Sequence, residues 1–216
     1  MALKRIIDIT FSFLGLLILL PIGIIISMFI LLDSKGSIFF NQTRIGLDQR
    51  PFKLIKFRTM YINSESGGQI TVGSKDSRIT KVGYWLRKLK LDELPQLWNV
   101  FVGEMSLVGP RPEVERYVNL YTAEELKVLS VRPGISDWAS IRFRNENALL
   151  DSASDPENFY IKEVMPVKIK MNLEYIERMN PWIDLKIILL SIFPFLKSRT
   201  VKKMKTKFSQ HLETNN

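Results

Sequence analysis

The sequence contains no cysteine and a single histidine, His211, which lies in its polar last segment. Without cysteine the chain can form no disulfide framework, no thiolate nucleophile and no Cys-ligated metal site, which is typical of proteins in a reducing compartment. With one imidazole available, acid–base chemistry falls to carboxylate, lysine or tyrosine side chains. A bound metal would take oxygen ligands, of the kind that Mg²⁺ prefers.

Acidic residues are few relative to basic ones, with 22 Asp and Glu against 31 Lys and Arg and a net charge of +9. This excess indicates an anionic partner, which could be nucleic acid, a phosphorylated substrate or an anionic membrane. The aromatic residues are not interleaved with the basic ones as a base-stacking platform requires, so nucleic acid is not expected. The length of 216 residues suits one domain with short appendages.

Charge is absent from 24 consecutive residues, Ile9 to Leu32. As one helix this run would be about 36 Å long, against a bilayer hydrocarbon core of about 30 Å. Pro21, near its midpoint, removes one backbone hydrogen bond and predicts a kink or a break between two halves of about 17 Å. A kinked transmembrane helix and a re-entrant hairpin are both compatible with this pattern. Basic residues occur on both sides of the run, so they indicate no single cytoplasmic end. Lys4 and Arg5 precede the run, and Lys35, Arg44 and Arg50 follow it.

A second apolar segment, residues 181–197, is interrupted by Asp184 and Lys186 and is too short to span a bilayer. It predicts an amphipathic helix that lies in the membrane interface. A basic tail follows over residues 198–216. This tail is compatible with a disordered solubilising segment and with attraction to anionic lipid, which contributes about 1 kcal/mol per basic residue near the surface.

Residues 35–180 form the soluble portion between the two apolar segments. The alternating pattern and turn residues of 36–60 predict a short β-hairpin. Residues 76–90 predict a basic helix with Asp76 or Ser77 near its N-cap. This helix leads directly to an acid pair.

The acid pair, Asp92 and Glu93, lies inside the string KLDELPQLWNV. A helix that begins at Asp92 would place Pro95 in its first turn, where the missing N–H costs little, and the pair would then be compatible with a simple acidic N-cap. Its apolar face would consist of Leu94, Leu97, Trp98 and Phe101. The strings GEMSLVGPRPE and VRPGISDWASIRFRNEN follow and carry arginines on loops stiffened by Pro and Gly, which suit bidentate capture of phosphate. Together these features favour phosphoryl transfer at a membrane surface.

The order of these motifs resembles the bacterial sugar transferase family, the monotopic phosphoglycosyl transferases. The resemblance rests on KRIIDI, GSIFFNQTRIGLDQRPFKLIKFRTM, LDELPQLWNV followed by MSLVGPRP, and VRPGISDWASI. It implies a mainly helical α/β fold in a monotopic membrane protein of the bacterial plasma (inner) membrane. Residues 1–34 would form a re-entrant helix-break-helix at Pro21, and residues 35–180 a catalytic domain on the cytoplasmic face, with a short β-hairpin and interfacial amphipathic helices.

The resemblance also implies an enzyme that transfers a phosphosugar from a UDP-sugar to a polyprenol phosphate such as undecaprenyl phosphate, with release of UMP. This reaction starts the assembly of a membrane-linked glycan, which could be O-antigen, capsule, exopolysaccharide or glycoprotein. By the same likeness Asp92 is the nucleophile that forms an aspartyl phosphosugar intermediate, and Glu93 assists as base or metal contact. Mg²⁺, held by Asp92 and Glu93, would neutralise the diphosphate.

The family's basic substrate contacts also carry over by the resemblance, residue by residue. They fall on Lys56, Arg58, Arg87, Arg111 and Arg144. The implied partners are a UDP-sugar, a polyprenol phosphate and membrane lipids, with no nucleic acid, and a homodimer stays open.

Two departures from the family pattern stand out. Leu20 precedes Pro21 where relatives have Ser, which removes one hydroxyl that could satisfy a freed carbonyl. Residues 137–143 differ from the Gly-Trp-Ala-Gln and Asn-Gly-Arg pattern of many relatives, and we interpret this loop as a determinant of sugar specificity. Three alternatives stay open: a non-catalytic membrane-surface scaffold that binds anionic lipid, a membrane-tethered nucleic-acid-binding protein, and direct transfer in a ternary complex.

Overall fold

The computed structural model describes residues 2–62, 76–144, 146–151 and 153–193. The basic tail expected over 198–216 lies outside the described residues, as do the last four residues of the amphipathic segment expected over 181–197. In the described part the chain is mostly helical, with one long apolar helix and two small two-stranded sheets, so the predicted mainly helical α/β class is confirmed.

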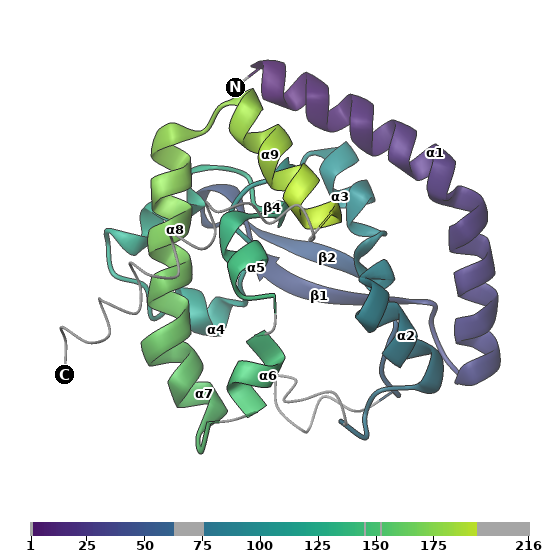
Figure 1. The fold of residues 1–216 in the computed structure, drawn as a ribbon. Coiled ribbons are helices and arrows are strands. Elements are labelled where there is room, and N and C mark those ends of the chain that lie inside the picture. The colour runs from purple at the N-terminus through teal and green to yellow at the C-terminus, as the bar shows by residue number, and fades with distance from the viewer. Residues whose placement is uncertain (1, 63–75, 145, 152, 194–216) are drawn as a thin grey trace.

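The uncharged run forms helix α1 (Ala2–Asp33), the one described helix that is long and apolar enough to cross a membrane. A kink or a break was predicted at Pro21, and the structure shows no break, because the helix continues through that residue. The helix bends part-way along its length and follows the edge of the body from α9 to α2 (Figure 1). A missing N–H and a ring that crowds the preceding turn are the usual cause of such a bend. Most large apolar side chains of α1 are exposed, as is typical of a helix that contacts lipid.

The predicted hairpin is confirmed as strands β1 (Phe39–Ile45) and β2 (Pro51–Phe57), which pair antiparallel with Phe39 opposite Phe57. The 3₁₀ turn η1 (Leu47–Gln49) connects them. Apolar side chains of β2 alternate toward the core, where Phe52 and Leu54 contact Val100 and Met105. Lys56 lies two residues beyond Leu54, so its side chain leaves the same face of β2 and reaches toward Glu93.

Helix α2 (Lys81–Leu89) begins later than expected, because Thr80 and not Asp76 or Ser77 is its N-cap. The Asp76 carboxylate instead accepts from the backbone N–H and guanidinium of Arg78 and closes a local turn. Lys90 ends the helix in a left-handed conformation, with φ of 60°.

The expected helix start at Asp92 was also wrong. Asp92 and Glu93 lie on the 3₁₀ turn η3 (Leu91–Glu93), and helix α3 (Gln96–Val102) begins only after Pro95. The left-handed Lys90 and Pro95 confine this turn from its two sides. The predicted apolar face of α3 does exist, and it packs on α1, where Phe101 contacts Phe13.

Strand β3 (Ser106–Val108) pairs parallel with β4 (Gly134–Ser136). The loops beside them approach so closely that a Cβ on Gly134 would lie 2.1 Å from the backbone N of Gly109, which explains a glycine in each Pro-Arg-bearing loop. The remaining described elements are α4 (Glu115–Val118), η4 (Glu125–Ser130), α5 (Trp138–Arg142), α6 (Glu146–Asp151), α7 (Pro156–Phe159), η5 (Tyr160–Val164), α8 (Met165–Arg178) and α9 (Pro181–Ile192).

The first turns of α1 are attached to the body by charged side chains. Lys4 Nζ lies 2.5 Å from Asp184 Oδ2 of α9, and the carboxylate of buried Asp8 accepts from the N–H of Leu107 at 3.0 Å. Arg5 donates to two carbonyl oxygens at the C-terminal end of α3. These contacts attach the first turns of α1 to α9, β3 and the C-terminal end of α3.

The end of α1 is attached to the same body. Asp33 accepts from the N–H of Val82 at 2.9 Å, and Arg58 donates to the carbonyl oxygens of Ser34 and Lys35 at 2.7 Å. Both ends of the long apolar helix therefore contact one and the same domain, and between them one face of the helix packs on α3 while the opposite face is exposed along the edge of the body (Figure 1).

Candidate functional site

Three basic side chains from separate elements converge on the acid pair of η3. Lys56 comes from β2, Arg87 from the last turn of α2, and Arg111 from the loop that follows β3. Asp92 is 7% exposed, so the cluster lies largely below the surface. Buried charges are stable only when they compensate one another, and here cations surround the two carboxylates.

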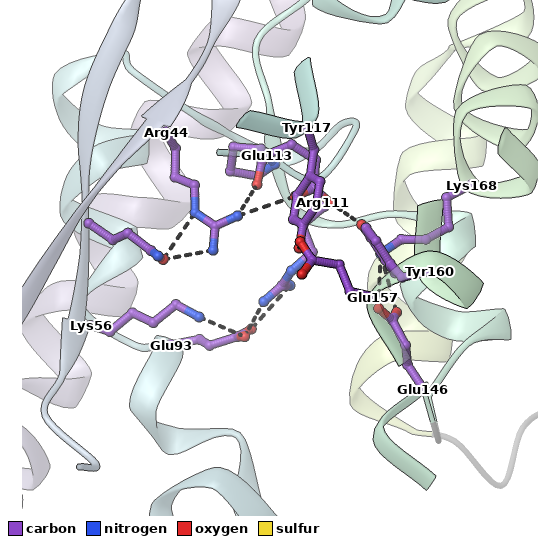
Figure 2. Close-up of polar contacts among 12 residues, drawn as sticks. Arg44, Lys56, Glu93, Arg111, Glu113, Tyr117, Glu146, Glu157, Tyr160 and Lys168 are labelled. Atoms are coloured by element: carbon purple, nitrogen blue, oxygen red, sulfur yellow. Dashed lines mark hydrogen bonds and ion pairs between the residues drawn. The ribbon is translucent and has the colours of Figure 1, made fainter. Parts of the chain in front are cut away.

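Glu93 is engaged by two of these cations (Figure 2). Arg111 donates to both carboxylate oxygens, and Lys56 Nζ lies 3.6 Å from Oε1. Burial alone would raise the pKa of Glu93, but Arg111 and Lys56 outweigh it and hold that pKa far below its usual range. Glu93 is therefore a permanent anion.

Asp92 is held differently. Within the described residues its carboxylate forms no hydrogen bond or ion pair, although Lys56 and Arg87 are near enough to attract it. Burial raises the pKa of Asp92, the neighbouring Glu93 adds to the rise, and Lys56, Lys90 and Arg87 oppose it. The result is a carboxylate in a cationic environment with its oxygen atoms unengaged.

Lys56 is the cation whose charge depends most on its surroundings. Burial lowers the pKa of Lys56 to about 8, with Glu93 opposing the shift and Arg111 reinforcing it. The ammonium is thus charged at neutral pH but loses its proton more readily than an exposed lysine.

Of the basic residues predicted for the site, the structure brings Lys56, Arg87 and Arg111 together and leaves two elsewhere. The guanidinium of buried Arg58 is used to hold the end of α1. Arg144 is exposed and donates to the carbonyl oxygen of Ser191 in α9 at 3.3 Å.

Sequence reasoning missed a second layer of charged groups behind Arg111. Arg44 of β1, Glu113, Tyr160 and Lys168 of α8 form a connected set of polar contacts (Figure 2). Two of them carried a signal in the sequence. Arg44 is a charged residue inside a predicted strand, and Glu113 is an acidic residue at the end of the string GPRPE. Tyr160 and Lys168 carried no such signal, because both lie in an ordinary helical pattern.

In the loop that departs from the family pattern, Asp137 is the N-cap of α5, and its Oδ1 accepts from the N–H of Ser140 at 2.7 Å. Glu93 raises the pKa of the Arg111 guanidinium, and the buried Asp137 is near enough to add to that rise. The loop thus lies beside the cluster, and its role in sugar specificity stays a prediction.

No cluster of three or more candidate metal-ligating side chains occurs in the part of the chain that the structure describes. The site offers two adjacent carboxylates, and the oxygen atoms of Asp92 have no hydrogen-bond partner in the described part of the chain. This donor set does not suit a metal held by protein alone, but it fits Mg²⁺, which is commonly bound by one or two carboxylates together with water and substrate phosphates.

Comparisons with known proteins agree on one family. The family model described as bacterial sugar transferase matches residues 1–198. The UDP-glucose:undecaprenyl-phosphate glucose-1-phosphate transferase of Escherichia coli strain K12 is 38% identical over 196 residues, covering 88% of this chain and 39% of that protein. The UDP-N-acetylgalactosamine-undecaprenyl-phosphate N-acetylgalactosaminephosphotransferase of Aeromonas hydrophila is 35% identical, covering 88% of this chain and 43% of that protein.

A relative of similar length is the uncharacterized sugar transferase EpsL of Bacillus subtilis strain 168. It is 35% identical over 204 residues, covering 94% of this chain and 92% of that protein. The chain spans about two fifths of the length of the longer relatives, and the match lies in the part that contains the cluster.

Proposed function

Because the chain belongs to the bacterial sugar transferase family, we propose that it transfers a sugar phosphate from a UDP-sugar to a polyprenol phosphate, with release of UMP. Several relatives are named for transfer of this kind to undecaprenyl phosphate, with glucose or N-acetylgalactosamine as the sugar. The observation that carries the proposal is the unengaged, buried Asp92 beside Lys56, Arg87 and Arg111.

The proposed first step is attack by an Asp92 carboxylate oxygen on the β-phosphorus of the UDP-sugar. A phosphorus–oxygen bond to Asp92 forms, the anhydride bond breaks, and UMP leaves with the bonding electrons. Two anions approach each other in this step, so nearby cations are needed to offset their repulsion. Lys56, Arg87 and Arg111 are placed to do so.

In the second step an oxygen of the polyprenol phosphate attacks the phosphorus of the aspartyl phosphosugar. The Asp92–phosphorus bond breaks, and the carboxylate returns with its electron pair. This two-step route predicts ping-pong kinetics, whereas direct attack by the lipid on the UDP-sugar predicts a ternary complex.

Asp92 and Glu93 would hold Mg²⁺ together with the diphosphate, and the ion would supply charge neutralisation at the leaving phosphate. The protein's own contribution is to keep Glu93 ionised and to hold two basic side chains, Lys56 and Arg111, against it. The phosphate oxygens of a bound substrate are suited to the same donors, because Arg binds carboxylate and phosphate with the same fork of N–H groups.

We also propose that α1 is re-entrant, so that the site lies on the cytoplasmic face of the bacterial inner membrane. The attachment of both ends of α1 to one domain supports this arrangement, since a simple crossing would carry its ends to opposite faces. A polyprenol phosphate presents its headgroup at the membrane surface, where a domain held in this way would meet it.

The test is UMP release by the full chain in nanodiscs with Mg²⁺, undecaprenyl phosphate and a panel of UDP-sugars. We expect release with at least one sugar, dependent on Mg²⁺ and lost in Asp92→Asn. Asp151→Asn, on the exposed side of α6, is the matched control and should behave as wild type. Release that persists in Asp92→Asn would contradict the proposed nucleophile. Silence across the panel, with tight binding to anionic vesicles, would favour the lipid-binding scaffold.

A further inference from the structure

The loop that carries Arg111 presents two opposite charges on its two sides. Pro110 and Pro112 flank Arg111 and fix φ near −65° at alternate positions. Arg111 extends toward Glu93 of η3. Glu113, two residues on, extends away from Glu93, toward Arg44 and Tyr160 (Figure 2). The position of Arg111 is therefore linked to whatever holds Glu113.

Strand β1 holds this loop through one arginine. Arg44 Nη1 donates to the carbonyl oxygen of Pro112 at 3.1 Å and lies 3.4 Å from Glu113 Oε2. Its Nη2 donates to Gln42 Oε1 at 2.7 Å, which orients the guanidinium. The backbone N–H of Ile45 donates to the carbonyl oxygen of Glu113 at 2.9 Å, so side chain and backbone act together.

On the other side the hydroxyl of Tyr160 donates to Glu113 Oε1. Lys168 Nζ lies 3.4 Å from that hydroxyl oxygen and 3.2 Å from Glu146 Oε2, so the contacts extend to α8 and α6. Burial raises the pKa of Tyr160 far above its usual range, and Glu113 adds to the rise. Tyr160 therefore remains a neutral donor at any working pH.

Packing alone does not hold the loop. A cavity of about 20 Å³ lies between it and α8, lined on the loop side by Arg111 and Glu113 and on the helix side by Lys168 and Asn172. The amide Oδ1 of Asn172 is buried there without a protein partner among the described residues. A loop backed by a void is free to shift unless its polar contacts are intact.

The charges of Arg44 and Arg111 also favour the pairing of each arginine with its own carboxylate. Arg44 is largely buried, and burial lowers its pKa, with Glu113 opposing the shift and Arg111 reinforcing it. Two arginines thus repel each other across the loop, and each needs its own carboxylate, Glu113 for Arg44 and Glu93 for Arg111. Removing Glu113 leaves Arg44 uncompensated beside Arg111.

We propose that Arg44, Glu113 and Tyr160 are positioning residues, which fix the point at which Arg111 contacts the substrate diphosphate. This inference rests on the proposed function, because it takes the anion bound by Arg111 to be a diphosphate. None of the three side chains needs to touch the substrate. They act through the 110–113 loop.

The test uses UDP as the probe and measures its affinity for the full chain in nanodiscs by calorimetry, without any turnover. Glu113→Gln and Tyr160→Phe should weaken UDP binding roughly tenfold, the size expected when a contact within the hydrogen-bond network that positions Arg111 is lost. Glu157→Gln is the matched control, because Glu157 lies nearby and pairs with the exposed Arg116. Its UDP affinity should equal that of wild type.

A purely structural role is separated by a double-mutant cycle. If Glu113 acts through Arg111, Glu113→Gln should change UDP affinity by less than about twofold in an Arg111→Lys background. Additive effects, or unchanged UDP affinity in Glu113→Gln, would overturn the inference. Failure of wild type itself to bind UDP would overturn the diphosphate site and the inference with it, whereas UDP binding without UMP release would count against the proposed reaction alone.

Discussion

Asp92 and Glu93 are adjacent in the chain, yet their carboxylates have opposite electrostatic situations. Glu93 is bound by Arg111 and Lys56, and its pKa is lowered far below its usual range. The pKa of Asp92 is raised by burial, and its oxygen atoms are unengaged within the described residues. A carboxylate whose lone pairs already accept from two cations is a weaker nucleophile, so these differences support the proposal that Asp92 is the attacking group.

Lys56 gives a prediction at the same scale. Its pKa is lowered to about 8, so the cation that faces the acid pair is present below pH 8 and lost as the pH rises through that value. We expect kcat/KM for the UDP-sugar to fall above about pH 8, because this parameter reports the free enzyme. Lys56→Arg should move that fall to higher pH, since arginine keeps its charge.

A pH–rate profile from pH 6 to 10 checks this prediction. Lys53→Arg is the control, because Lys53 lies on the same strand but is exposed, and its ammonium donates to Thr43 rather than to the acid pair. It should leave the profile unchanged. An alkaline limb that stays in place in Lys56→Arg would show that a different group titrates there.

At the scale of elements, the η3 turn shows where sequence reasoning stopped. The motif identified Asp92 and Glu93 as candidate site residues, but it did not predict their backbone conformation. A helix starting at Asp92 satisfies the local pattern, and only the left-handed Lys90 and the later start of α3 turn the segment into a 3₁₀ turn. Whether a residue such as Lys90 adopts the left-handed conformation depends on tertiary contacts, which a single sequence does not reveal.

The role of Arg58 was likewise hidden in the sequence. KFRTM places Lys56 and Arg58 on the same motif, and a basic motif suggests phosphate binding for both. In the structure only Lys56 reaches the acid pair, whereas Arg58 binds carbonyl oxygens at the end of α1. Those carbonyls have no partner further along the helix, so an arginine there satisfies groups that would otherwise be exposed.

Arg58→Ala should therefore destabilise the fold without changing substrate affinity. Loss of buried, charge-assisted hydrogen bonds predicts a decrease of about 2–4 kcal/mol in the free energy of unfolding. Thermal unfolding and UDP calorimetry in nanodiscs measure the two effects, with the exposed Arg50→Ala as control. Arg58→Lys provides a milder change that still folds. A wild-type unfolding temperature together with weak UDP binding would instead place Arg58 in the substrate site.

At the scale of the whole molecule, the attachment of α1 at both ends governs the membrane arrangement. Lys4 and Asp8 hold its start, and Asp33 holds its end, all against the same domain. The exposed apolar middle would enter the bilayer and return.

The absence of native cysteine allows this arrangement to be tested directly. Single cysteines at the exposed positions Ala2 and Ser37 would lie at the start of α1 and just beyond its end, so a re-entrant helix predicts that both react with an impermeant maleimide from the cytoplasmic side only. Labelling in inside-out vesicles and in spheroplasts distinguishes the faces. Reaction of Ala2→Cys and Ser37→Cys from opposite faces would establish a crossing helix.

The sequence was most informative where one strong pattern decided the outcome. The uncharged run predicted α1, and the turn residues predicted the β1–β2 hairpin, because both depend on local chemistry. The contacts of Lys4 with Asp184 and of Arg44 with Glu113 join residues far apart in the chain. No local pattern specifies such pairs, so the attachment of α1 and the layer behind Arg111 emerged only from the fold.

The measurement that tests the central claim most directly is mass spectrometry of the chain after mixing with a UDP-sugar and Mg²⁺, without polyprenol phosphate. Covalent catalysis predicts a mass increase equal to one phosphosugar, located on the peptide that contains Asp92, lost on addition of undecaprenyl phosphate and absent in Asp92→Asn. UMP release that requires the lipid from the start, with no adduct on Asp92 in wild type, would contradict the covalent route and establish direct transfer.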